Sequence, residues 1–153
     1  MRIKFPRLLF IPPALIVVAL FVTLPVLSVS QGGELLAGAS GLQLALGDIT
    51  PQADFTLRVT SGDYELLLIP ALVLLALAVV FVSDDLMRGV YLGAVGAALI
   101  VWALYWLEIE RDLGALARAD VGFGLAYEVG WWLIGGVLAL MSLMGLTFDS
   151  NRR

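Results

Sequence analysis

Three carboxylates in one short segment are the residues of this chain best suited to chemistry. Glu108, Glu110 and Asp112 surround Arg111, and Glu108 and Asp112 are four residues apart, so on a helix they share a face. Carboxylate oxygens are ligands that calcium prefers, and a further outer acidic residue joining this pair would complete an oxygen site. The alternative is a helix end that enters water, with its carboxylates paired to Arg111.

The residue types that most enzymes and metalloproteins use are missing from the chain. Its 153 residues contain no histidine and no cysteine, which removes disulfides, thiolate metal sites and the commonest ligand of haem and zinc. There is no nucleophile motif, phosphate-binding glycine loop or lipidation signal. A net charge of -4 without a basic cluster argues against nucleic acid as a partner. We expect no cofactor, no metal and no intrinsic catalysis.

Hydropathy places the chain in a membrane. Hydrophobic residues make up 61% of it and the mean hydropathy is +0.99, well above soluble domains. We predict an all-α membrane protein of one domain, residues 1–153, built as a four-helix transmembrane bundle. The first apolar run also resembles a signal peptide, but it is longer than the usual core of about 7–15 residues. The predicted helices cover about 8–29, 66–82, 86–107 and 129–148.

Positive charges predict the orientation, because Lys and Arg are retained on the cytoplasmic side. With both termini inside, the inner segments hold Arg2, Lys4, Arg7, Arg88, Arg152 and Arg153, and the outer segments hold Arg58, Arg111 and Arg118. This distribution predicts two cytoplasmic termini, in what we expect to be a bacterial cytoplasmic membrane. The outer face is then acidic, which makes it either a solvated rim or a docking surface for a basic partner or divalent cations.

The first outer loop, residues 30–65, is predicted to contain a β-hairpin. Apolar and other residues alternate over 41–47 and again over 55–60, which is the period of a strand. The intervening segment contains Thr50-Pro51, a suitable connection. We therefore expect strands 41–47 and 55–60 to pair over the outer ends of the helices.

This arrangement resembles that of claudins, which have four helices, both ends inside and a large first outer loop of β structure. Within that loop, Gly41-Leu42 matches the central pair of the family's Trp-Gly-Leu-Trp segment. The tryptophans of that segment and the two cysteines that follow it in the family are absent here. The chain is also similar to small uncharacterised four-helix membrane proteins of bacteria, and that likeness implies no activity.

Small residues predict where helices meet. On the third predicted helix they recur every four residues, and the fourth repeats this spacing once, a pattern that lets backbones approach closely in lipid. Trp102 and Trp106 lie on the opposite side of the third helix and are expected to face lipid. The small residues would contact either this chain's own helices or a second chain. The predicted interface consists of Gly89, Gly93, Gly96, Ala97, Gly135 and Ala139.

The predicted spans hold no ionisable side chain in their central portions. Ion-coupled transporters and proton relays need charged groups there, because something must bind the charge halfway across. We therefore expect a structural or accessory subunit of a membrane complex, in contact with lipid and with other membrane subunits or itself. The alternative is an oligomeric small transporter or channel component. The two hypotheses differ in one observable property, since a conduit needs a polar path through the bundle.

Overall fold

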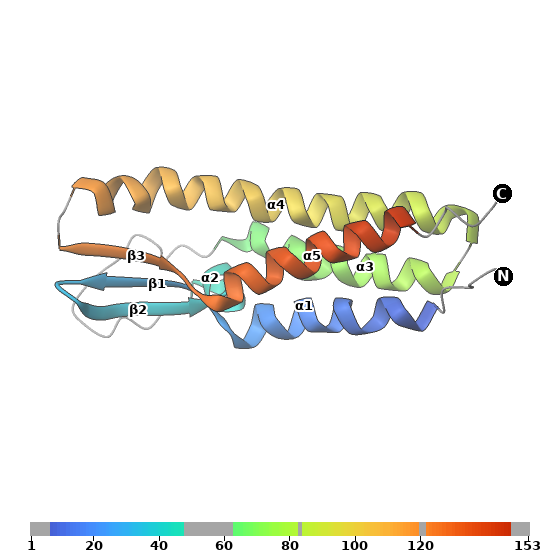
Figure 1. The fold of residues 1–153 in the computed structure, drawn as a ribbon, viewed down its shortest axis with the longest axis horizontal. Helices are drawn as coiled ribbons and strands as arrows, with labels where there is room; N and C mark the ends of the chain where they lie inside the picture. The colour runs from blue at the N-terminus through green and yellow to red at the C-terminus, as the bar shows by residue number, and fades with distance from the viewer. Residues whose placement is uncertain (1–6, 48–62, 83, 120–121, 148–153) are drawn as a thin grey trace.

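The computed structural model describes residues 7–47, 63–82, 84–119 and 122–147. Within these residues, four helices of 13 or more residues lie side by side, and a small β-sheet extends from one end of them (Figure 1). The first of these helices begins, and the last ends, at the opposite end from the sheet. The helices are α1 (Ile11–Thr23), α3 (Leu68–Val82), α4 (Asp84–Ala119) and α5 (Val129–Thr147).

Three helical segments in the described part of the chain are long and apolar enough to cross a membrane. They are Tyr64–Phe81, Gly89–Ala115 and Val129–Leu146. The N-terminal segment Leu8–Thr23 is apolar but shorter. At about 1.5 Å per residue it reaches roughly 24 Å, less than the hydrocarbon core of about 30 Å. Length and composition thus support a membrane protein with three of the expected spans.

The first helix ends well before the predicted residue 29. Proline disfavours helical backbone at the residue before it and lacks an N–H of its own. Leu24, which precedes Pro25, is accordingly extended, with φ -93° and ψ 142°. The chain continues directly as strand β1 (Pro25–Gln31). The helix therefore ends just before Pro25, and the predicted helix over residues 24–29 is wrong.

The β-hairpin lies upstream of the predicted one. β1 pairs in antiparallel fashion with β2 (Glu34–Ser40), and Gln31 lies opposite Glu34. Only Gly32 and Gly33 form the turn, both with positive φ, 61° and 87°. Tight two-residue hairpin turns that match the strand twist require positive φ, which glycine adopts without strain.

The predicted strand 41–47 is a helix instead, α2 (Gly41–Leu46). Its first turn is closed by a capping box, in which Ser40 Oγ accepts from the Gln43 backbone N–H and the Gln43 side chain accepts from the Ser40 N–H. Gly47 ends it in the left-handed conformation, φ 71°. These local hydrogen bonds outweigh the alternation of leucines. The second predicted strand, 55–60, lies outside the described residues.

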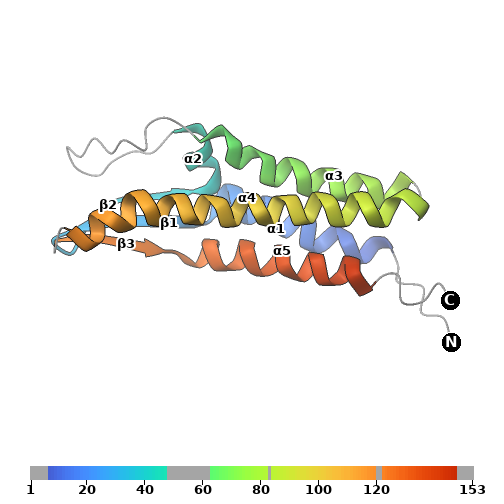
Figure 2. The ribbon, with the colours of Figure 1, turned by 90° about the horizontal axis from the view of Figure 1, so that it is seen from above.

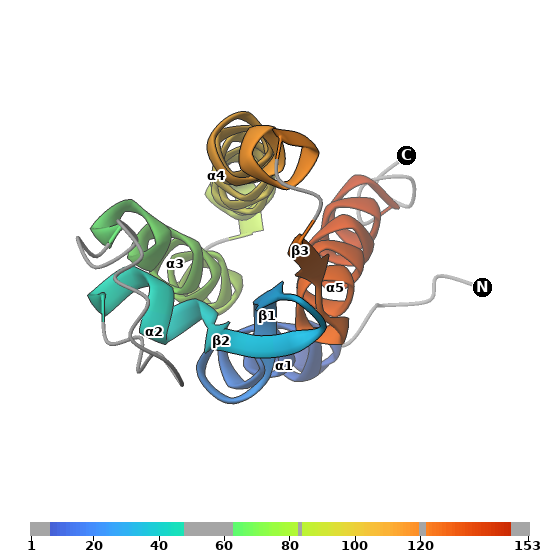
Figure 3. The same cartoon turned by 90° about the vertical axis from the view of Figure 1, so that its left-hand side faces the viewer.

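A third strand, β3 (Phe123–Tyr127), pairs with the other edge of β1, so the sheet order is β2-β1-β3. Leu27 lies opposite Tyr127 in this antiparallel pair. Because β1 follows α1 closely and only Glu128 separates β3 from α5, the sheet is joined to two helices of the bundle. Figure 3 shows the strands end-on, between α1, α4 and α5.

α4 continues to Ala119, past the predicted end at residue 107. Ile109 and Leu113, one turn apart on this extension, are buried, and α4 packs against β3. Figure 2 shows the far part of α4 running alongside the strands. The extension beyond Leu107 is about 12 residues long, or roughly 18 Å. The helix continues because burial against the sheet stabilises it where the apolar run ends.

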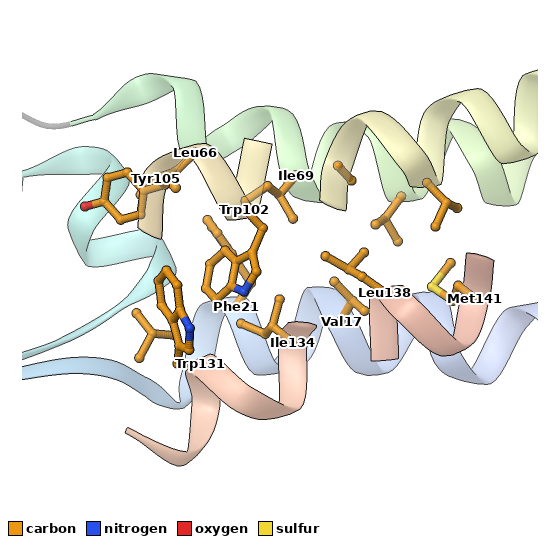
Figure 4. Close-up of a cluster of buried hydrophobic side chains, with 14 of the residues drawn as sticks. Val17, Phe21, Leu66, Ile69, Trp102, Tyr105, Trp131, Ile134, Leu138 and Met141 are labelled. Carbon is orange, nitrogen blue, oxygen red and sulfur yellow. The ribbon is translucent and has the colours of Figure 1, made fainter. Parts of the chain in front are cut away.

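The helix bundle has an apolar interior. Figure 4 shows Val17, Phe21, Ile134 and Leu138 meeting at its centre, with aromatic rings toward the sheet end. Among the described residues, the buried side chains classed as polar or charged are Ser28 and Ser40, and both belong to the sheet. A short 3-10 turn, η3 (Tyr64–Leu67), leads into α3, and another, η1 (Arg7–Phe10), into α1.

Candidate functional site

The outer acidic cluster, Glu108, Glu110 and Asp112, does not converge on one point. Arg111 donates to Asp112 over 2.8 Å and lies 3.9 Å from a Glu108 oxygen, with all three side chains exposed. Glu110 instead accepts a hydrogen bond of 2.8 Å from the Tyr127 hydroxyl. The described residues include no group of three or more acidic side chains placed to hold a metal ion. The geometry corresponds to a solvated helix with local Arg pairing and one carboxylate turned toward the sheet.

The bond between Glu110 and Tyr127 ties the extension of α4 to β3. Burial and the neighbouring Glu110 carboxylate raise the pKa of the Tyr127 hydroxyl above its ordinary value. The raised pKa keeps the hydroxyl protonated, and so able to donate to Glu110, to higher pH than an exposed tyrosine. On the same helix face, the Arg118 guanidinium donates to the Glu110 carbonyl over 3.4 Å. Glu110 thus has a structural contact rather than an open coordination site.

A second polar tie fixes the sheet to the start of α5. Ser28 Oγ of β1 donates to Glu128 Oε1 over 2.5 Å. The Glu128 N–H donates to the Val26 carbonyl over 3.0 Å. Both bonds join residues about 100 positions apart in sequence. They hold the sheet in a defined direction relative to the bundle.

Four aromatic side chains gather where the bundle meets the sheet, and we call them the outer aromatic cluster: Trp102, Tyr105, Tyr127 and Trp131. Trp131 is central to it. Its ring stacks on Trp102 with centroids 4.0 Å apart, and lies 5.0 Å from Tyr127 and 6.5 Å from Tyr105. Figure 4 shows Trp102 and Trp131 facing each other from α4 and α5.

The prediction that Trp102 faces lipid is therefore wrong. Its side chain is 5% exposed and turns inward, because Gly135 of α5 leaves room for the indole. A Cβ at position 135 would come within 3.2 Å of Trp102 Nε1. Trp106, one turn further on α4, is 43% exposed and does face outward.

The predicted interface residues differ in how exposed they are. Gly89 and Gly93 of α4 are exposed, and a Cβ added at either would meet no atom within 4 Å. Gly96 and Ala97 are half-buried, and Ala139 of α5 is exposed. Gly135 contacts the Trp102 indole. Among the described residues, Gly89 and Gly93 thus make no close contact with another helix of this chain, and the predicted interface stays a prediction.

A close contact between α4 and α5 uses a glycine that sequence reasoning did not select. A Cβ at Gly145 of α5 would lie 2.6 Å from Leu92 and 2.8 Å from Tyr91 on α4. Tyr91 is buried there, and its hydroxyl donates to the Met141 carbonyl over 3.2 Å. Gly145 lies ten residues after Gly135, outside a four-residue repeat, so the spacing rule could not identify it.

A shallow groove of about 90 Å³ opens between α3 with its leading turn η3 and α4, near the sheet end of the bundle. Its floor includes Leu66 and Tyr105, which Figure 4 shows at this end. Asp63 and Tyr105 face this groove, from just before η3 and from α4. The remaining lining residues are Glu65, Leu68, Val101, Leu104 and Glu108. Sequence reasoning missed this site, because it joins residues 40 positions apart.

Comparison with protein-family models, curated proteins and solved structures finds no match. The topological resemblance to claudins therefore stays a prediction.

Proposed function

We propose that the chain is a small accessory subunit of a membrane complex, in which it supplies contact surfaces and no catalysis. In this proposal four helices cross the bilayer, with both termini on the cytoplasmic side of a bacterial membrane. α1 is the short one, but the apolar residues Leu24–Val26 continue it in extended form. At about 3.3 Å per residue they add roughly 10 Å, which brings the apolar length above the hydrocarbon thickness.

The observation that carries the proposal is the apolar interior of the bundle. A transporter or channel needs polar or charged groups along a path through the membrane. The described bundle core is made of aliphatic and aromatic side chains, and its buried Tyr91 hydroxyl is satisfied by a backbone carbonyl. This favours a packed structural unit over the alternative, an oligomeric transporter or channel component in which each chain carries a path.

The second support is a free helix face. Gly89 and Gly93 form an exposed stripe on α4, continued by Ile100, which is 61% exposed. Small residues allow the backbone of another helix to approach closely, where dispersion contacts rather than a hydrophobic force drive association. We assign this stripe to contact with a helix of another subunit.

The third support is the stiff extension outside the bundle. α4 and the sheet are joined by Tyr127 to Glu110, and the sheet is joined to α5 by Ser28 to Glu128. A rigid projection of roughly 18 Å loses little conformational entropy when it binds a partner. It suits a protein that positions other subunits.

Site-specific crosslinking tests the stripe. Because the chain has no cysteine, Gly93→Cys gives a single thiol that can carry a benzophenone probe in native membranes. We expect a discrete crosslinked product of higher mass after illumination. Gly136→Cys, an exposed glycine on α5 with equally open space, serves as the control and should give lipid adducts only.

The crosslinking outcomes separate the two hypotheses. A product that contains a different polypeptide supports the accessory role. A product that contains two copies of this chain, with nothing else attached, would favour the self-contained oligomer. Equal, diffuse labelling from both positions would contradict a specific contact on α4.

A further inference from the structure

Three exposed aromatic residues lie on three helical segments at the sheet end of the bundle, and we call them the exposed aromatic belt: Tyr64 of η3, Trp106 of α4 and Trp132 of α5. They are 66%, 43% and 66% exposed. The outer aromatic cluster is separate, because its rings pack against one another. Tryptophan and tyrosine are enriched where hydrocarbon meets lipid headgroups, because each ring has an apolar body and a polar edge.

The two tryptophans of the belt lie at nearly the same level along the bundle. Trp106 is one turn beyond Trp102 on α4, and Trp132 directly follows Trp131 on α5. The stack of Trp102 on Trp131 aligns the two helices, which run in opposite directions (Figure 1). The belt tryptophans are therefore about five residues of helical rise apart, or roughly 8 Å. The headgroup zone on one side of a bilayer is about 5–8 Å thick, so it can contain both.

Tyr64 and the end of α1 lie at this level as well. The turn that begins with Tyr64 lines the groove opposite Tyr105, the residue before Trp106. A Cβ at Gly130 of α5 would lie 2.5 Å from the Pro25 carbonyl oxygen, just past the end of α1. Of the four long helices, only α4 continues beyond the belt.

Exposed side chains change character across the belt. On the bundle side, Ile100 and Leu104 of α4 are 61% and 59% exposed. On the sheet side, the side chains of Glu108, Arg111 and Asp112 are 57%, 73% and 60% exposed. The large exposed residues of α3 and α5 on the bundle side include six leucines: Leu68, Leu74, Leu75, Leu133, Leu140 and Leu143. Aliphatic, aromatic and charged surfaces thus follow one another in the order of a bilayer leaflet.

The length of α4 requires part of it to lie outside the membrane. Its apolar segment Gly89–Ala115 has 27 residues, or roughly 40 Å, whereas the hydrocarbon core is about 30 Å thick. The distance from Gly89 to Glu108 is roughly 29 Å along the helix. A hydrocarbon core that starts at Gly89 therefore ends next to the belt.

We propose that the exposed aromatic belt rests among the phospholipid headgroups and fixes the depth of the protein, so that the sheet and the end of α4 stand in water. The proposal rests on the membrane-spanning placement of the proposed function and adds the level at which the membrane ends. The projection then contacts only those parts of a partner that also lie outside the bilayer.

Nitroxide labels on single cysteines test the depth, since the chain has no cysteine of its own. Leu104→Cys, Glu108→Cys and Asp112→Cys are prepared in the full-length protein and reconstituted in phosphatidylcholine vesicles. Collisions with oxygen, which concentrates in hydrocarbon, are compared with collisions with a water-soluble nickel chelate. We expect oxygen to dominate at position 104 and the chelate at position 112, with the crossover within one turn of Trp106.

A double variant tests whether the rings set that depth. Tyr64→Leu with Trp132→Leu replaces two exposed rings, a change that leaves packing intact. Leucine prefers hydrocarbon, so the crossover should move toward Asp112 by about one turn, or roughly 5 Å. Leu140→Ala with Leu143→Ala, two exposed leucines of α5, is the matched control and should leave the crossover in place.

A label at Leu140→Cys, in the middle of α5, separates the possible failures. Chelate access at Leu140→Cys would contradict the membrane-spanning placement itself. With Leu140→Cys shielded, oxygen dominance at Asp112→Cys or chelate dominance at Leu104→Cys would overturn the proposed membrane level alone. An unmoved crossover in the double variant would overturn the anchoring by the belt.

Discussion

Trp102 of α4 and Trp131 of α5 stack with ring centroids 4.0 Å apart and planes 27° from parallel. Gly135, one turn after Trp131, provides the space for this stack. Trp131 also contacts Tyr105 and Tyr127. The stack therefore joins two long helices at the level where the sheet begins, and it is the packing centre of the sheet end of the bundle.

Removing the central ring should destabilise the protein strongly. Trp131→Ala leaves a cavity among three aromatic neighbours, and we expect a loss of about 3 kcal/mol in the free energy of unfolding. Thermal unfolding in mild detergent, followed by circular dichroism, measures it. Trp132→Ala is the control, because Trp132 is 66% exposed on the same helix. Equal destabilisation by both variants would contradict the packing role of Trp131.

The inner contact between α4 and α5 should not tolerate a larger residue. Gly145→Val places methyl groups against Tyr91 and Leu92, and overpacking of this kind costs about 1–3 kcal/mol. The unfolding midpoint in detergent should fall accordingly. Gly136→Ala adds a methyl group in open space and should leave the midpoint unchanged or slightly higher, since alanine favours helix. An unchanged midpoint for Gly145→Val would refute the close approach of these two helices.

The hydrogen bond from Tyr127 to Glu110 should make the free energy of unfolding decrease as the pH becomes alkaline. The pKa of Tyr127 is raised in the folded protein, so the folded state holds the phenolic proton more tightly than the unfolded state. This contribution is fully present below the unfolded value of about 10 and is lost as the pH rises above it. Urea unfolding of the unmodified protein should show a steeper decline above pH 10 than that of Tyr127→Phe. Parallel curves would show that Tyr127 does not titrate differently in the two states.

The hydrogen bond from Ser28 to Glu128, which joins the sheet to the start of α5, should contribute measurably to the free energy of unfolding. Ser28→Ala removes the donor to Glu128 in a nearly buried position, and leaving the carboxylate unpaired should cost about 1–3 kcal/mol. Hydrogen exchange should also become faster at the N–H of Glu128, which bonds to β1. Ser142→Ala, whose hydroxyl donates only to the Leu138 carbonyl within its own helix, should cost less than about 0.5 kcal/mol. The Glu128 N–H should therefore exchange more slowly in the Ser142→Ala variant than in the Ser28→Ala variant.

The long helices were predictable because hydropathy and length determine them almost alone. The predicted helix end at residue 82 agrees with the structure and the one at residue 107 does not, for a physical reason. α3 does end at Val82, whereas α4 continues because Ile109 and Leu113 find a sheet to pack against. That sheet could not be predicted from local hydropathy, since β3 pairs with a strand about 100 residues earlier.

The hairpin and the site were harder to predict. Gly32-Gly33 is a tight-turn signal that marks the true hairpin, but the apolar residues before it also continue the first hydrophobic run. Pro25 was the residue that separated helix from strand. The exposed stripe at Gly89 and Gly93 follows from spacing, while the groove at Tyr105 required knowing which helices are neighbours.

The mass of the particle that contains this chain in its native membrane tests the accessory role most directly. The tagged protein is extracted in mild detergent, purified and weighed by native mass spectrometry, with Gly93→Leu and Gly136→Leu measured alongside. We predict a particle containing this 16.4 kDa chain and other polypeptides in fixed stoichiometry, weakened by Gly93→Leu and unaffected by Gly136→Leu. A particle whose mass is an integer multiple of this chain alone would contradict the accessory role and indicate a self-contained oligomer.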